Sequence, residues 1–113
     1  MVRINKAKAN YFLKKLKNLQ YPQRIKDDAE LDFLIIDIFS FDSVIIGSLT
    51  SCTVNQKDID TWDIYYNDVK DIDFKELKSN INENNAKIII ASAYLNELKN
   101  AYFFLKKEVE KNK

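Results

Sequence analysis

The sequence predicts an all-α fold, a single small bundle of four to five helices in which residues 1–113 form one domain. Apolar residues recur at steps of three and four along most of the chain, which is the spacing of amphipathic helices. The chain has only one glycine and one proline, Gly47 and Pro22, whereas sheets with tight hairpins usually need more of both. Its 113 residues, 46% of them apolar, suffice for one hydrophobic core.

Two predicted helices occupy the first half of the chain. The first spans about residues 4–19 and ends before Tyr21-Pro22, because the residue before a proline is pushed out of the helical region. Its apolar side consists of Ala9, Phe12, Leu13, Leu16 and Leu19. The second follows an acidic cap at residues 27–30, and its apolar positions are Leu31, Leu34, Ile38, Phe41, Ile45, Leu49 and Cys52. Because β-branched and aromatic residues are dense here, an α+β fold with a short strand pair within residues 31–54 is the alternative.

The second half of the chain predicts the remaining helices. A third helix over about residues 58–72 has an apolar side of Ile59, Trp62, Tyr66 and Val69. A short fourth helix follows Asp73 and contributes Phe74, Leu77 and Ile81, and residues 80–85 form the last connection. The last helix, residues 86–110, has an apolar stripe of Ile88, Ala91, Leu95, Leu98, Tyr102, Leu105 and Val109. Further apolar residues widen this face, which indicates either a central helix of the bundle or a homo-oligomer contact.

The net charge of +1 conceals three regions of different sign. Residues 1–26 contain eight basic residues and no acidic residue. Residues 27–85 contain four lysines and 14 acidic residues, and residues 86–113 contain six lysines and three glutamates. The chain is thus a basic arm, an acidic middle and a mildly basic tail, and either charged region could bind a partner.

The acidic middle predicts a surface for a basic protein partner. The candidate residues are Asp60, Asp63, Tyr65, Asp68 and Asp71 on the third helix. Within it, Asp63-Ile64-Tyr65-Tyr66 resembles the aspartate-tyrosine-tyrosine helix of the colicin DNase immunity family, over four residues and with the aspartate one position closer to the tyrosines. The resemblance implies an inhibitor that neutralises a nuclease toxin by presenting acid and tyrosine. The expected function is therefore an intracellular protein-binding module with an immunity or antitoxin role.

The basic arm gives the alternative, a nucleic-acid-binding protein. Lys6, Lys14, Lys15 and Lys17 on the first helix could contact phosphates, and the affinity would then fall with rising salt. Against this interpretation, the acidic middle would repel the same polyanion, and the basic residues flank the apolar stripe on both sides. No helix-turn-helix, zinc-finger or stacking motif accompanies them.

The missing residue types argue against catalysis. The chain has no histidine, which excludes Ser-His-Asp, Cys-His and histidine-metal sites. Its single glycine, Gly47, cannot build a phosphate-binding loop, and Cys52 falls on an apolar stripe where a thiol is inert. We expect no catalytic residue, no cofactor and no metal. The one enzyme class left open is a magnesium-dependent all-α nucleotide hydrolase, because Asp60 with Asp63 and Asp68 with Asp71 stand three residues apart.

Cytoplasmic localisation without membrane binding is expected. The first residues are charged and no apolar run follows them, so they do not resemble a signal peptide. The lone cysteine cannot form an internal disulfide, which agrees with a reducing compartment. The most apolar stretch, residues 31–49, contains Asp32, Asp37 and Asp42, which would be costly in lipid.

Overall fold

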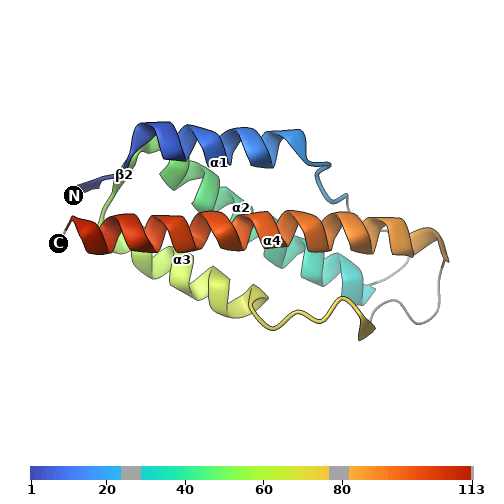
Figure 1. Cartoon of the computed structure of the whole chain (residues 1–113). Coiled ribbons are helices and arrows are strands. Elements are labelled where there is room, and N and C mark those ends of the chain that lie inside the picture. Colours follow the sequence, from blue (N-terminus) through green and yellow to red (C-terminus); the bar gives the residue numbers. More distant parts are fainter. Residues whose placement is uncertain (24–28, 77–81, 113) are drawn as a thin grey trace.

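The computed structural model describes residues 1–23, 29–76 and 82–112. Within these ranges the elements are β1 (Val2–Arg3), α1 (Lys6–Asn18), α2 (Ala29–Ser51), β2 (Thr53–Val54), α3 (Gln56–Val69) and α4 (Asn82–Lys111). The predicted all-α bundle is confirmed. Helix α4 runs along the 47 × 25 × 20 Å molecule, with α1 on one side of it, α3 on the other and α2 behind (Figure 1).

The predicted alternative of a strand pair within residues 31–54 is wrong, because residues 29–51 form one helix. Six apolar side chains at helical spacing are fully buried: Leu31, Ile35, Ile38, Phe41, Ile45 and Leu49. This one-sided burial stabilises a helix although many of these residues favour strands. The strand pair that does form is antiparallel and joins β1 to β2, with Val2 opposite Val54. Only β2 lies in the predicted region.

Asparagine caps begin two of the helices. The Asn5 side chain accepts a hydrogen bond from the Lys8 amide at 3.0 Å. Asn55 and Asp58 form a reciprocal capping box, which starts α3 two residues before the predicted Asp58. Directly after the C-terminal end of α2, Cys52 adopts a left-handed backbone conformation with a φ of 54°, and β2 follows it.

Two predictions around the last connection need correction. Among the described residues, 74 and 75 form a turn and 76 is in a 3-10 conformation, so no α-helix begins directly after Asp73, which accepts a hydrogen bond from the Lys75 amide at 2.9 Å. The rest of the predicted fourth helix, with Leu77 and Ile81, lies outside the described residues, as do residues 80 and 81 of the predicted connection. Residues 82–85 belong to α4, because this segment has no proline or glycine to stop a helix.

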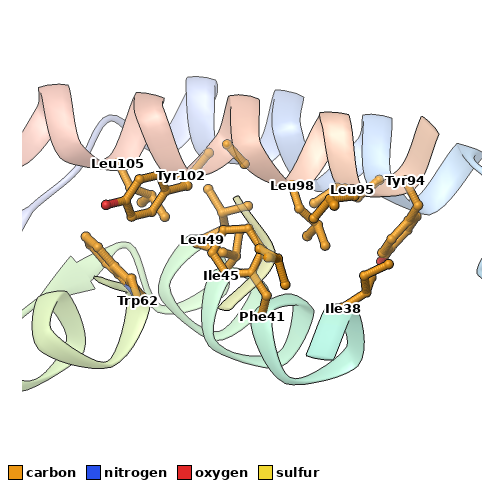
Figure 2. Close-up of a cluster of buried hydrophobic side chains, with 14 of the residues drawn as sticks. Ile38, Phe41, Ile45, Leu49, Trp62, Tyr94, Leu95, Leu98, Tyr102 and Leu105 are labelled. Atoms are coloured by element: carbon orange, nitrogen blue, oxygen red, sulfur yellow. The ribbon is translucent and has the colours of Figure 1, made fainter. Parts of the chain in front are cut away.

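The core lies where α2 and α4 face each other. Figure 2 shows Leu95, Leu98 and Leu105 of α4 directed toward the apolar side of α2, which presents Ile38, Phe41, Ile45 and Leu49. Trp62 of α3 closes one end of this cluster and is 1% exposed. Its indole N–H donates to the Ser48 hydroxyl at 2.6 Å, so the only polar atom of the ring is satisfied in the core.

Polar contacts fix the parts of the chain that surround this core. The Tyr21 and Tyr94 hydroxyls both donate to the Asp42 carboxylate, which ties the segment after α1 to α2 and α4. Burial raises the pKa of Asp42 despite these two donors, and burial together with Asp42 raises the pKa of Tyr21 to about 12. At the other end of the bundle, the buried Glu108 accepts from the Asn5 amide at 3.2 Å.

Among the described residues, one helix is long and apolar enough to cross a membrane by length and composition alone. It is the Glu30–Ser51 part of α2, with a mean hydropathy of 1.8 over its best window. The core helix of a soluble protein can meet the same criterion; here 33% of the window is buried, and this helix supplies the six core side chains named above. Asp42 within it is partly buried and accepts hydrogen bonds from two tyrosines.

The Trp62 hydrogen bond gives a first prediction. Ser48→Ala leaves the buried indole N–H without an acceptor, which should lower the free energy of unfolding by about 1–3 kcal/mol. Ser43→Ala is the matched control, because Ser43 is exposed and its hydroxyl bonds only to the Phe39 carbonyl of its own helix at 3.0 Å. Urea denaturation measures both variants. Equal destabilisation by the two substitutions would show that the Trp62 contact is unimportant.

Candidate protein-binding surface

The five residues of the predicted acidic surface differ in their exposure to solvent. Asp60, Asp68 and Asp71 are exposed, the first two on one side of α3 and Asp71 just after its end. Asp63 faces α4 instead, where it accepts from the Tyr102 hydroxyl at 2.7 Å and lies 3.3 Å from the Lys106 ammonium. Tyr65 is half-buried and packs against the core. The three exposed aspartates are therefore open to a partner, whereas Asp63, with its side chain 39% exposed, already binds Tyr102 and Lys106.

The residues behind the immunity-family resemblance do not share one exposed face. Tyr66 stacks on Tyr102 with ring centroids 4.3 Å apart, and Asp63 binds the same Tyr102. Burial and the hydrogen bond to Asp63 raise the pKa of Tyr102 above its ordinary value. Asp63 and Tyr66 thus hold α3 against α4, while Ile64 between them is 62% exposed.

A hollow of about 550 Å³ lies between the first turns of α2 and the end of α3. We call it the acidic hollow; its lining residues are Glu30, Leu34, Asn67, Asp68, Asp71, Ile72, Asp73 and Glu76. Five of them carry carboxylates, and none of the described lining residues is basic. Sequence reasoning identified Asp68 and Asp71 but missed Glu30, because the α2–α3 hairpin brings together residues about 40 positions apart.

Like charges meet at the edge of the acidic hollow. The pKa of Asp37 on α2 is raised, first by partial burial and second by the negative charge of Asp68 on α3. Glu30 is favourably placed in the first turn of α2, but Asp71 and Asp73 follow the end of α3, where the helix dipole is also negative. Lys99 of α4 lies near this charge: it donates to the Lys70 carbonyl at 3.2 Å, and the negative charge of Asp71 partly opposes the lowering of its pKa by burial.

Exposed apolar side chains accompany these carboxylates. Ile64 stands one helical turn from both Asp60 and Asp68 on the outer side of α3. On α2, Phe33 is 68% exposed and stands one turn before Asp37. Apolar anchors among charges are typical of protein interfaces, in which the anchors supply contact area and the charges steer association.

Three of the four lysines of the predicted nucleic-acid surface lie on one side of α1. At about 100° per residue, Lys6, Lys14 and Lys17 fall within about 80° of one another, and Lys15 falls on another side. Lys15 lies 5.1 Å from the centre of the Tyr11 ring and 3.8 Å from Glu97, and its pKa is raised first by Tyr11 and then by Glu97. Lys17 lines a cavity beside Tyr21.

The carboxylate pairs proposed for magnesium are also not both available. Asp63 is occupied by Tyr102 and Lys106, which separates it from Asp60. In the part of the chain that the structure describes, no group of three or more aspartate, glutamate or cysteine side chains could hold a metal ion. Asp68 and Asp71 are both exposed, and the nucleotide hydrolase alternative stays a prediction.

Comparison with known proteins assigns this chain to no family. No protein-family model matches the chain, and neither the search of curated proteins nor that of solved structures found a match. Any proposal about function therefore depends on the geometry and charge of the described surfaces.

The like-charge contact gives a second prediction. Because the pKa of Asp37 is raised in the fold, the folded state holds this proton more tightly than the unfolded chain does, and stability falls as the pH rises through that range. Asp37→Asn should raise the melting temperature at pH 7 by about 1–3 °C. The gain should shrink as the pH falls below the raised pKa.

Thermal melts at pH 3 to 8 test this prediction, with Glu110→Gln as the control. Glu110 is exposed near the end of α4, away from the acidic hollow. A melting temperature for Asp37→Asn that is lower than that of the unmodified protein at pH 7 would contradict the account.

Proposed function

We propose that this protein is a protein-binding module whose acidic hollow binds a basic protein. The observation that carries the proposal is the gathering of five carboxylates around one hollow with no basic residue among its described lining. An arginine or lysine side chain of a partner would find several acceptors there, and carboxylate–guanidinium bonds are among the strongest side-chain contacts.

The surroundings of the hollow favour a protein over a small cation. Ile64 on α3 is 62% exposed, and Phe33 on α2 is 68% exposed. These two helices border the hollow. A small polyamine would leave these side chains in water, whereas a protein surface can bury them. The partner is therefore a protein with basic residues around an apolar patch.

The energetics of the fold support the same proposal. The pKa of Asp37 is raised first by burial and second by the negative charge of Asp68, so repulsion between carboxylates of α2 and α3 opposes folding in the free protein. A basic partner would turn this repulsion into attraction. Surface charges that oppose folding are expected where binding requires them.

The sharpest form of the proposal is an inhibitor that neutralises a nuclease toxin. A nuclease must present basic residues to hold phosphates, so its substrate-binding surface is complementary to an array of carboxylates. Occupation of that surface by the acidic hollow would exclude nucleic acid. This form stays a proposal, and the intracellular immunity or antitoxin role follows from it.

Two variants with equal net charge test the surface. Asp68→Asn with Asp71→Asn changes the net charge by +2, and so does Glu110→Lys on α4. In pull-downs from nuclease-treated native lysate, a basic protein should be recovered with the unmodified protein and with Glu110→Lys. Its recovery with the double variant should fall about tenfold or more, because hydrogen-bonded interfacial charges contribute strongly.

The captured protein is then purified and titrated calorimetrically against all three forms. Its activity on nucleic acid, measured with and without the chain, tests the inhibitory role separately. Equal affinity for the double variant and the unmodified protein would place the interface elsewhere. Recovery that depends on nucleic acid in the lysate would also overturn the proposal.

A further inference from the structure

A second surface, between α1 and α4, combines aromatic rings with lysines. A groove of about 400 Å³ is lined by Tyr11, Phe12, Phe103 and Phe104, with Lys8 on α1 and Lys107 on α4. We call it the aromatic groove. Its lining residues come from α1 and α4, whereas the acidic hollow is lined by residues of α2, of the end of α3 and of the segment after it.

The rings of the aromatic groove are held in place but remain open. Phe12 stacks on Phe104 with centroids 4.9 Å apart, and Tyr11 meets Phe12 edge-on at 5.3 Å. Phe103 is supported from the α3 side by Tyr66, edge-on at 5.7 Å. Tyr11 is nevertheless 54% exposed and Phe103 47% exposed. Two supported aromatic rings thus offer surface to a ligand at little cost in side-chain entropy.

The charge of the aromatic groove suits an anion. No acidic residue is among its described lining, and in the described part of the chain neither Lys8 nor Lys107 forms an ion pair. The carboxylates of the acidic hollow line a different cavity, and none of them lines the aromatic groove. Exposed charges more than about 8 Å apart are largely screened at physiological salt.

We infer that the aromatic groove binds single-stranded nucleic acid. Bases stack on Tyr11 and Phe103, and Lys8 and Lys107 contact the phosphates on either side. Stacking rings beside cations are the usual elements of such sites. Asn100, which also lines the groove, has an amide that can reach a base edge. A duplex would hide the base faces that the rings need, whereas the combination of stacking rings and lysines suits the bases and phosphates of a single strand.

This site differs from the one predicted by sequence and from the proposed protein interface. None of Lys6, Lys14, Lys15 and Lys17 is among the lining residues of the aromatic groove, although the Lys15 ammonium lies 5.1 Å from the centre of the Tyr11 ring. The lysines that line it are Lys8 of α1 and Lys107 of α4, which are about 100 residues apart in the sequence. The inference holds whether or not the acidic hollow binds a basic protein.

Fluorescence anisotropy with labelled 12-nucleotide oligo-dT and oligo-U tests the inference, with a 12-base-pair duplex and a poly-glutamate peptide as comparison ligands. Both single strands should bind more tightly than the duplex and the peptide. Tyr11→Ala and Phe103→Ala should each weaken binding about tenfold. Tyr11→Phe keeps the ring and should bind normally. Lys107→Ala should reduce the slope of log affinity against log salt by about one.

Two controls keep the test independent of folding and of the proposed protein interface. Lys14→Ala removes an exposed α1 lysine outside the groove, and Asp68→Asn with Asp71→Asn alters the acidic hollow; neither should weaken oligonucleotide binding. Circular dichroism melts confirm that each variant is folded. Absence of binding by either single strand, tighter binding of the duplex or the peptide, or equal binding by folded Tyr11→Ala and Phe103→Ala would overturn the inference.

Discussion

The packing of α4 against α2 is the interaction on which the other parts of the structure depend. Each helix contributes a row of fully buried side chains, and α1 and α3 lie against the same pair. Because α1 lies on one flank of α4 and α3 on the other, the polar surfaces of these two helices are kept apart. The aromatic groove and the acidic hollow are consequences of that arrangement.

The order of charge along the chain becomes a separation of charge in space. The basic arm forms α1, which lies beside the lysine-containing C-terminal half of α4. The acidic middle forms the α2–α3 hairpin, whose open end collects carboxylates from both helices. A net charge near zero therefore conceals two surfaces of opposite sign, each of which suits a different class of partner.

Sequence patterns predicted the helices well, because burial in a bundle follows the helical period of the apolar residues. They did not predict the surfaces, since these depend on contacts between helices. Asp63 stands among exposed aspartates in the sequence, yet Tyr102 and Lys106 occupy it in the fold. Glu30 and Lys107 join their surfaces only through tertiary packing, which no spacing within one helix reveals.

If the acidic hollow recognises a basic protein, it should also bind a short basic peptide. A titration with hexa-arginine, followed by amide chemical shifts in nitrogen-15 NMR spectra, tests this claim. The shift changes should concentrate in residues 30–37 and 64–76 and disappear at high salt. Shift changes that concentrate on α1, or that spread evenly over all four helices, would contradict it.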